Sequence, residues 1–168
     1  PVLSIAESFA TLGMVAWLAW QTPLQRWRGH AVTAVVLLYA TNRTVAVWAT
    51  GGLATRQFTM LVLLGTLLVG RYRDERRGGA FLVAGSVVLG LAELTRPEAL
   101  MLGPLILLWW LIDAWFRGRW TPTAAVRALG PFGAIVAMHL VWRWFTYGEL
   151  LPNTYYAKSV GAWWDVGR

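Results

Sequence analysis

The strongest constraint on the fold is a series of long apolar runs that recur along the whole chain. Residues 105–110, for example, read Leu-Ile-Leu-Leu-Trp-Trp. A soluble fold of 168 residues could not bury this much apolar surface, whereas the ~30 Å hydrocarbon core of a bilayer accepts it. Lipid offers no partners for open backbone N–H and C=O groups, so only helices or closed barrels can cross it. The runs lack the apolar/polar alternation of barrel strands, and the sequence therefore predicts an all-α transmembrane helix bundle.

About six membrane-spanning helices are predicted. The third and fourth are short for a full crossing, which needs ~20 residues. We expect residues 1–147 to form the bundle and residues 148–168 to form an extracytoplasmic segment that leads into a missing C-terminal region. Because the chain starts at Pro1 without an initiator Met and enters an apolar run at once, we expect a fragment of a longer membrane protein. The predicted spans cover about residues 2–20, 31–48, 58–70, 80–94, 99–116 and 128–147.

Composition agrees with a membrane location and argues against several other classes. Hydrophobic residues make up 57% of the chain and charged residues only 14%, whereas soluble domains carry about 25% charged residues. The net charge of +7 would indicate nucleic-acid binding in a soluble protein, but here the arginines cluster between apolar runs, which is typical of membrane-flanking charge. There is no Cys, and no His/carboxylate cluster has metal-ligand spacing, so we predict no disulfide and no metal site.

The distribution of Lys and Arg predicts the orientation of the bundle. Nine of the fifteen lie in three alternate connections between the predicted spans, and the other six are dispersed. By the positive-inside rule the nine are cytoplasmic. Residues 48–56, residues 94–98 and the segment from 148 onward then lie on the outer face. The nine are Arg26, Arg28, Arg71, Arg73, Arg76, Arg77, Arg117, Arg119 and Arg127.

The outer connection Thr95-Arg96-Pro97-Glu98 has two interpretations. It reads as a capping box that opens the fifth helix, with Thr95 as N-cap and Glu98 reaching back. This does not explain Arg96, a fixed cation at membrane depth, or Glu93 three residues earlier. Ionisable groups inside a membrane tend to face the protein interior or a wet cavity. Arg96 either pairs with Glu93 or Glu98, or binds a phosphate, which its planar guanidinium suits.

The final segment, residues 148–158, is Gly-Glu-Leu-Leu-Pro-Asn-Thr-Tyr-Tyr-Ala-Lys and also has two interpretations. As an interfacial anchor, it would hold Tyr155 and Tyr156 at headgroup level, with Asn153 capping a short outer helix. As a binding site, it would surround a polar ligand. Tyrosine rings and an Asn amide suit sugar hydroxyls, and Lys158 suits a phosphate as a point charge.

Three isolated polar residues lie within the predicted spans. Glu7 is expected to face the bundle interior. His139 and Arg143 are four residues apart, so they share one helix face. Arg143 is expected to extend outward to the membrane surface.

Three motifs occur together and in a fixed order: Trp-Ala-Thr-Gly-Gly-Leu from residue 48, Leu-Thr-Arg-Pro-Glu from residue 94, and the segment 148–158. This set resembles bacterial polytopic glycosyltransferases of the GT-C class. The group that it resembles most is that of the actinobacterial terminal arabinofuranosyltransferases and related membrane sugar transferases. The resemblance covers about residues 48–158, and its last motif is the most specific.

The resemblance implies a transferase that uses a polyprenyl-phosphate sugar and a cell-envelope glycan or lipid acceptor. Transfer would occur on the outer face of the bacterial cytoplasmic membrane. Arg96 and Lys158 would bind the donor phosphate, and Glu98 would be the catalytic acid or base. A divalent cation stays open as a cofactor, and no nucleic acid is expected as a partner. The residues that would hold sugar or acceptor are Asn153, Tyr155, Tyr156, Trp48 and Thr50.

Two departures from the family pattern lead us to expect that this chain alone is inactive. The class usually places a catalytic acid in its first outer loop, which is expected upstream of Pro1. The family turn commonly reads Gly-Leu-Glu-Thr, where this chain has Ala54 in place of Glu. The rival interpretation is a multi-pass transporter or a non-catalytic membrane scaffold, with the intramembrane charges along a substrate path. No pair of related halves is visible, which favours the transferase.

Overall fold

The structure, a computed structural model, describes residues 2–21, 25–50, 54–72 and 75–148, and this part of the chain consists of helices and short connections without a strand. The all-α class is therefore confirmed. A 3₁₀ turn, η1 (Gln25–Trp27), joins the first two helices. The helices are α1 (Val2–Trp20), α2 (Arg28–Thr41), α3 (Arg43–Thr50), α4 (Thr55–Gly70), α5 (Glu75–Thr95), α6 (Ala99–Phe116) and α7 (Pro122–Tyr147).

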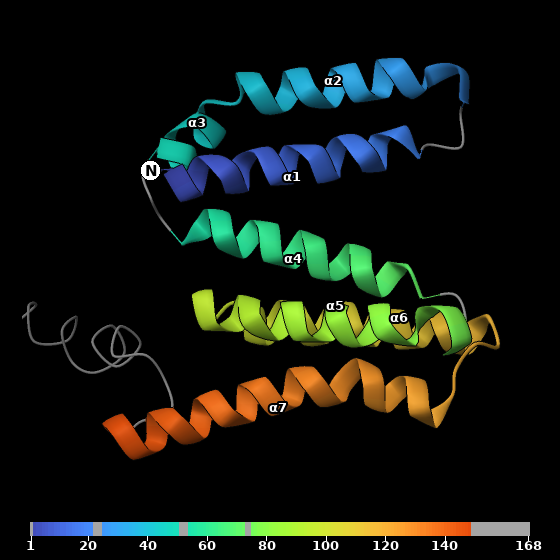
Figure 1. The fold of residues 1–168 in the computed structure, drawn as a ribbon, viewed down its shortest axis with the longest axis vertical. Helices are drawn as coiled ribbons and strands as arrows, with labels where there is room; N and C mark the ends of the chain where they lie inside the picture. Colours follow the sequence, from blue (N-terminus) through green and yellow to red (C-terminus); the bar gives the residue numbers. More distant parts are fainter. Residues whose placement is uncertain (1, 22–24, 51–53, 73–74, 149–168) are drawn as a thin grey trace, which may run out of the picture.

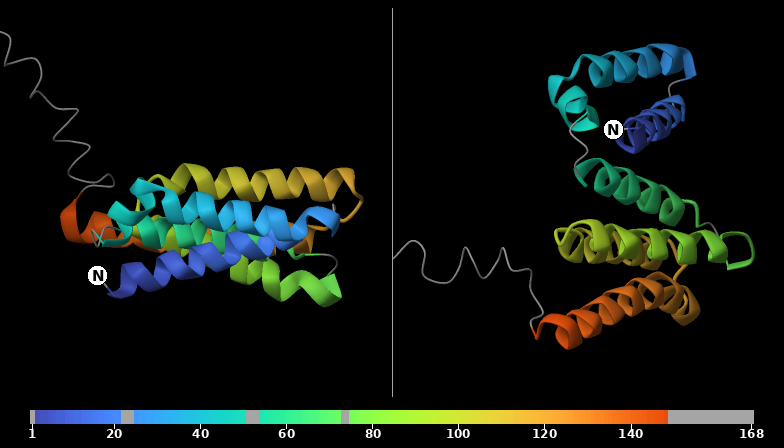
Figure 2. Two further views of the ribbon diagram at one scale, coloured as in Figure 1. Left: turned by 90° about the horizontal axis from the view of Figure 1, so that it is seen from above. Right: turned by 60° about the vertical axis from the view of Figure 1, so that its left-hand side comes forward.

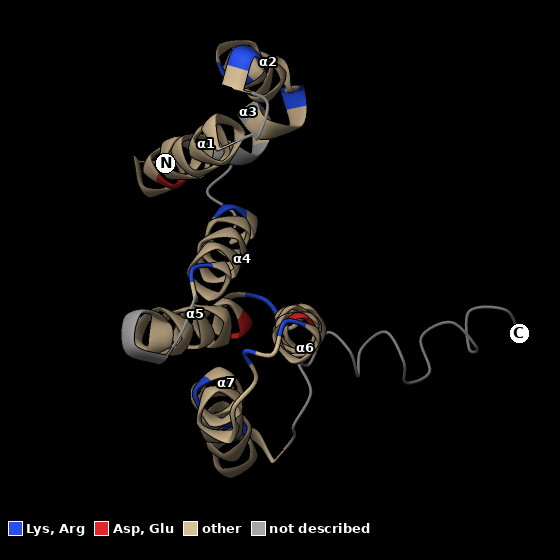
Figure 3. Ribbon diagram, turned by 90° about the vertical axis from the view of Figure 1, so that its right-hand side faces the viewer, with Lys and Arg blue, Asp and Glu red and all other residues tan. Residues whose placement is uncertain are grey.

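The long helices run alternately back and forth, so that their connections gather at two ends of the bundle (Figure 1). Helices α4 and α5 lie at the centre, α1 to α3 lie on one side of them, and α7 lies on the other, while α6 stands beside α5 (Figures 1–3). We call the end with α3, the α5–α6 turn and the end of α7 the motif end. We call the opposite end the arginine end. Its described residues are 21, 25–28, 71–72 and 117–121, and Figure 3 looks onto it, with Lys and Arg in blue.

Four of the described helices are long and apolar enough to cross a membrane: α1, residues Gly78–Thr95 of α5, α6 and α7. Helix α4 is also apolar but has only 16 residues. Large apolar side chains are exposed over many of these helices, for example Trp109 at 73% and Phe145 at 83%. These are the helices of a membrane protein, because such side chains need a non-aqueous surrounding.

The predicted second span is broken where its sequence is interrupted by Asn42. The Asn42 backbone is extended, with φ −75° and ψ 109°, and it ends α2. Its side-chain oxygen accepts a hydrogen bond of 3.2 Å from the Val45 N–H and so caps the start of α3. The span predicted over 31–48 is therefore two helices joined at an angle, because the Asn side chain competes with the helical backbone for the N–H group.

Helices α4 and α5 pack closely at two glycines. A Cβ atom on Gly85 would lie 2.9 Å from the backbone oxygen of Gly65 and 2.9 Å from the Val69 nitrogen. One on Gly65 would lie 2.7 Å from the Leu89 side chain. Small residues at such crossings let membrane helices approach until their backbones nearly touch. The glycines therefore set the position of α4, which carries part of the site described below.

Helix α5 is joined to α7 by the buried hydroxyl of Ser86. It donates to the Ala128 carbonyl oxygen at 2.6 Å and accepts from the Phe132 N–H at 3.0 Å. These two backbone groups pair directly in an unbroken α-helix. Pro131 lies between them inside α7, has no N–H of its own and crowds the preceding turn. The Ser86 hydroxyl thus bridges a place where proline disturbs the helix.

Helix α7 begins six residues before the predicted start at 128. Thr121 has extended backbone angles, and its hydroxyl oxygen accepts a hydrogen bond of 3.0 Å from the Ala124 N–H. Pro122 follows at the first helical position, where a missing N–H does no harm. The helix ends at Gly148, whose φ of +70° favours glycine and whose N–H donates to the Trp144 carbonyl.

Candidate functional site

The turn that carries Arg96 connects α5 to α6 at the motif end, and it does not contain the predicted capping box. Thr95 is still helical, and its hydroxyl donates back to the Ala92 carbonyl at 2.7 Å. Glu98 has right-handed helical backbone angles and makes no side-chain cap. The capping prediction is wrong because a residue inside a helix directs its hydroxyl to the preceding turn instead of to the N–H groups that follow.

The Arg96 guanidinium ties this turn to the start of α4. Its Nη1 donates to the Thr55 hydroxyl at 3.0 Å, and its Nη2 donates to Glu98 Oε1 at 2.8 Å. The guanidinium carbon lies 5.9 Å from the centre of the Phe58 ring. Of the two carboxylates predicted as partners of Arg96, Glu98 is therefore the one that pairs with it. The side chain of Arg96 stays 36% exposed, so a ligand can reach it from the surface.

Glu98 is an exposed carboxylate whose environment favours its ionised form. A hydrogen bond with its own backbone is the main reason that its pKa lies below the ordinary value. The hydrogen bond and the charge of Arg96 lower the pKa further, while partial burial opposes the shift. Glu98 is thus an anion at neutral pH, as a general base must be, but the same shift makes it a weaker proton acceptor.

A second arginine at the motif end, Arg56, is buried, with only 6% of its surface exposed. Its Nη1 donates to the Tyr39 hydroxyl at 3.1 Å, and its Nη2 donates to the Val45 carbonyl. The Tyr39 hydroxyl in turn donates to the Ser8 carbonyl at 3.1 Å. The Arg56 Nε is buried without a hydrogen-bond partner. No described carboxylate forms an ion pair with Arg56, so neutral groups hold this buried charge.

The face of α1 that meets these residues is polar. The buried residues of α1 are Ser4, Glu7, Ser8 and Thr11, and its large apolar residues face outward. Glu7 is 6% exposed, which confirms that it faces the bundle. The hydroxyls of Ser8 and Thr11 each bond to the carbonyl four residues earlier on α1, at 2.8 Å. The motif end therefore has a polar interior between α1, α2 and α4.

Helices α5 and α7 share a buried carboxylate–imidazole pair. Glu93 is 4% exposed, and both of its carboxylate oxygens lie 2.9 Å from His139 Nδ1. The imidazole stacks on Trp142, with ring centres 6.1 Å apart and an interplanar angle of 23°. With its proton on Nδ1, the imidazole donates to the carboxylate and leaves a lone pair on Nε2. A carboxylate and an imidazole so arranged can accept and hold a proton.

Sequence reasoning missed both Arg56 and the Glu93–His139 pair as site elements. It grouped Glu93 with Arg96 and placed His139 beside Arg143 on one helix face. For Glu93 and His139 the available signal was an isolated ionisable group inside an apolar helix, whereas Arg56 lies in a predicted connection and gave no such signal. That signal indicates burial but names no partner, because the pairing depends on how α5 and α7 are rotated against each other.

Of the predicted site residues, the structure brings Arg96 and Glu98 together and leaves the rest untested. Asn153, Tyr155, Tyr156 and Lys158 lie outside the described residues, as do the side chains of Trp48 and Thr50 in the last turn of α3. Within the described part of the chain, no group of three or more His, Asp or Glu side chains could hold a metal ion.

The fold and these polar clusters define an all-helical membrane-protein bundle, with ionisable groups gathered between the helices and apolar side chains turned outward. Comparison of the chain with protein-family models, with curated proteins and with solved structures found no match. The class of the protein therefore rests on its helices and its composition alone.

Proposed function

We propose that the chain is part of a membrane glycosyltransferase that moves a sugar from a polyprenyl-phosphate donor to a cell-envelope glycan or lipid. The observation that carries the proposal is the hydrogen bond between Arg96 Nη1 and the Thr55 hydroxyl, 3.0 Å long. It joins Arg96 of the Leu-Thr-Arg-Pro-Glu motif to Thr55, the last residue of the turn compared with the family's Gly-Leu-Glu-Thr, and so connects two of the three segments on which the family resemblance rests. Their contact across 41 residues of sequence is what a shared site requires.

The orientation of the proposed enzyme follows from the arginines. The helix ends that flank the three Arg-rich connections lie together at one end of the bundle, so the positive-inside rule assigns that end to the cytoplasm. The motif end then faces outward, in a multi-pass arrangement within the bacterial cytoplasmic membrane. A lipid-linked donor reaches such a site from within the bilayer, with its phosphate at the depth of Arg96.

In the proposed reaction, the acceptor hydroxyl oxygen attacks the anomeric carbon of the donor sugar. The bond from that carbon to the phosphate oxygen breaks, and the polyprenyl phosphate leaves with the electron pair. Arg96 and Lys158 stabilise the charge that develops on the leaving phosphate. A carboxylate takes the hydroxyl proton, and Glu98 is the described candidate. The residues proposed to hold sugar or acceptor are Asn153, Tyr155, Tyr156, Trp48 and Thr50.

The partial exposure of the Arg96 side chain indicates where the donor phosphate would bind. Arg96 Nη2 donates to the Glu98 carboxylate, and Nη1 donates to the neutral hydroxyl of Thr55. The phosphodiester anion of the donor attracts the guanidinium more strongly than a neutral hydroxyl does and matches its planar donors, and the attraction grows as the leaving phosphate gains its second charge. Donor binding is therefore expected to replace the Thr55 contact and to free α4 from the α5–α6 turn.

One observation favours the alternative of a multi-pass transporter. The buried Glu93–His139 pair lies between two helices that can cross a membrane, where ionisable groups often relay protons or bind substrate. In a transporter this pair would carry the proton or bind the substrate, and Arg96 would have no direct part in transport. In the glycosyltransferase it holds α5 against α7 and so positions the turn that carries Arg96.

The test is sugar transfer by the full-length protein in membranes, measured with a radiolabelled polyprenyl-phosphate sugar. Arg96→Ala is expected to lower the transfer rate about a hundredfold, the usual effect of removing one charge-stabilising group, and Lys158→Ala is expected to act in the same direction. Arg117→Gln is the matched control. It removes an arginine at the arginine end, where Asp113 keeps a second partner in Arg119 at 2.7 Å.

Normal transfer by a correctly inserted Arg96→Ala protein would refute the phosphate-binding role. Absence of transfer by the wild type, together with Glu93-dependent solute uptake into vesicles, would replace the transferase with the transporter. A protein that does neither, while it holds partner proteins together in the membrane, would be a scaffold.

A further inference from the structure

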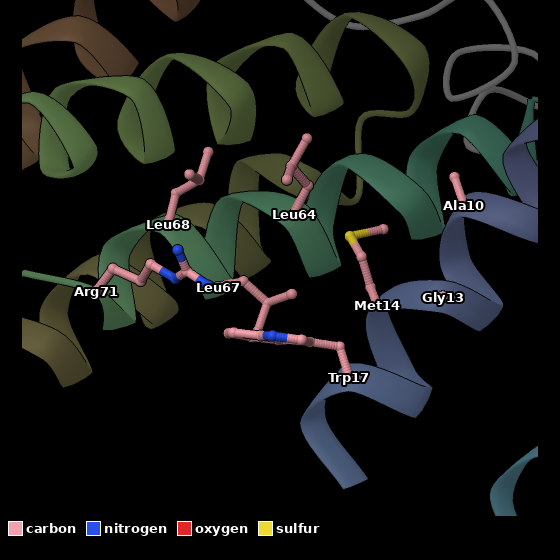
Figure 4. A pocket seen from close by; sticks show the side chains of 8 residues that line it. All are labelled: Ala10, Gly13, Met14, Trp17, Leu64, Leu67, Leu68 and Arg71. Carbon is pink, nitrogen blue, oxygen red and sulfur yellow. The ribbon is translucent and has the colours of Figure 1, made fainter. Parts of the chain in front are cut away.

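A groove on the side of the bundle is formed by α1 and α4, and it encloses about 470 Å³ (Figure 4). Each helix contributes four positions with the spacing i, i+3, i+4 and i+7, which places them on one helix face. On α1 they begin at Ala10 and end at Trp17, and on α4 they begin at Leu64 and end at Arg71. Seven residues of helix span ~10 Å, so the groove is an elongated trough.

The groove exists because α1 and α4 separate toward the arginine end (Figures 1 and 2). All buried residues of α1 lie between Ser4 and Thr11, at the end where the two helices meet. Beyond them Gly13 offers no side chain, and a Cβ atom built on it would meet no atom within 4 Å. The gap is therefore real space along the two helices.

The groove is apolar along its length and ends in a cation. Leu67, Leu68 and Met14 line its walls, and the Arg71 guanidinium carbon lies 4.5 Å from the centre of the Trp17 ring. Figure 4 shows the Arg71 and Trp17 side chains at the same end. Arg71 is exposed, and no described carboxylate pairs with it. A second hollow of about 430 Å³ continues past this pair to Gln21.

We propose that this groove binds one anionic phospholipid, with an acyl chain between α1 and α4 and the phosphate on Arg71. Acyl chains fit a trough that offers them almost only apolar side chains, and its volume lies within the usual range for ligand sites. A Trp ring beside a fixed cation is the arrangement found at headgroup level in membrane proteins. A phospholipid is favoured over a peptide because the walls offer almost no hydrogen-bond partners for a peptide backbone.

The positive charge of the arginine end favours an anionic lipid over a neutral one. The described part of the arginine end carries four further arginines, and Asp113 forms ion pairs with two of them. Anionic headgroups are attracted to such a surface, and each cation near it strengthens binding about fivefold. The site lies at the opposite end of the bundle from Arg96, so it does not depend on the proposed transferase.

The site can be tested on the purified chain in nanodiscs. The probe is a phosphatidylglycerol with a photoactivatable diazirine on one acyl chain, competed by unlabelled dioleoyl phosphatidylglycerol or dioleoyl phosphatidylcholine. Cross-links are mapped by mass spectrometry, and they are expected on Met14 and on residues 64–68. Phosphatidylglycerol is expected to compete at a concentration about fivefold lower than phosphatidylcholine.

Two variants, each with a matched control, separate the headgroup from the chain. Arg71→Gln is expected to remove the fivefold preference for phosphatidylglycerol over phosphatidylcholine. Arg26→Gln is its control, because it also removes an arginine that lies over a Trp ring at the arginine end, and it is expected to leave the preference unchanged. Gly13→Leu fills the trough and is expected to suppress cross-linking by both lipids. Gly133→Leu is its control, because a Cβ atom there also meets no atom within 4 Å.

Any of the following results would overturn the proposal. The first is cross-links spread evenly over all helices, which would mean ordinary annular lipid. The second is equal competition by the two lipids in the wild type. The third is an Arg71→Gln protein that behaves like Arg26→Gln, or a Gly13→Leu protein that behaves like Gly133→Leu.

Discussion

Replacing Ser86 by Ala should loosen the junction of α5 and α7. The change removes a fully buried hydroxyl that donates to the Ala128 carbonyl at 2.6 Å and accepts from the Phe132 N–H at 3.0 Å. A hydrogen bond contributes about 1 kcal/mol net in proteins, and about 0.6 kcal/mol on average between membrane helices. Two such bonds give an expected loss of about 1–2 kcal/mol in the free energy of unfolding. The lower value applies if the two backbone groups of α7 can pair directly once the hydroxyl is gone.

The assay is thermal unfolding of the chain in mild detergent, followed by circular dichroism, with Thr66→Ala as the control. The Thr66 hydroxyl bonds only within α4, to the Val62 carbonyl at 2.7 Å, so its removal should change stability very little. Adding Pro131→Ala, which restores the missing N–H in α7, should reduce the effect of Ser86→Ala. A Ser86→Ala protein as stable as the Thr66→Ala protein would refute the idea that this hydroxyl repairs the helix at the proline.

Three further predictions use stability as the readout. Glu93→Ala leaves the His139 imidazole without its buried acceptor and should lower the free energy of unfolding by about 3 kcal/mol, the low end for breaking a buried pair; an unchanged melting temperature would contradict this. Gly85→Ala should lower the free energy of unfolding by about 1–3 kcal/mol, because the new Cβ meets backbone atoms at 2.9 Å. Gly133→Ala should leave it unchanged, because a Cβ there meets no atom within 4 Å, and equal effects of the two changes would rule out close packing as the cause. Because the folded-state pKa of Glu98 is depressed, its ion pair should stabilise the protein above its unfolded pKa of about 4.3 and lose that contribution as the pH falls through the lower folded value. The wild type and Glu98→Gln should therefore differ at pH 7 and converge below about pH 4, and a difference that persists in acid would count against the ion pair.

Much of the fold could be predicted because membrane helices are encoded locally. The apolar run from 99 to 116 corresponds residue for residue to α6 (Ala99–Phe116). The Thr-Pro pair at 121–122 was a readable start signal for α7, and overlooking it put the predicted start six residues late. The interruption at Asn42 was also visible as a polar residue at the end of an apolar run.

The candidate site was less predictable because its contacts join distant segments. The sequence offered Arg96 two carboxylates, and only the tertiary structure selects Glu98, since Glu93 is turned toward α7. The Glu93–His139 contact spans 46 residues and depends on the rotation of two helices about their axes. The contact of Arg56 with Tyr39 likewise depends on where α2 ends and how α4 packs on α1.

The sequence by itself determined that the chain is helical and belongs in a membrane, because hydrogen bonding and lipid solvation act residue by residue along an apolar run. It also indicated that Glu7, an isolated carboxyl in an apolar run, faces the bundle interior. Only the tertiary structure decided the partners of the ionisable groups and opened the α1–α4 groove, because helix rotation and separation depend on packing between segments far apart in sequence, such as Gly65 against Gly85.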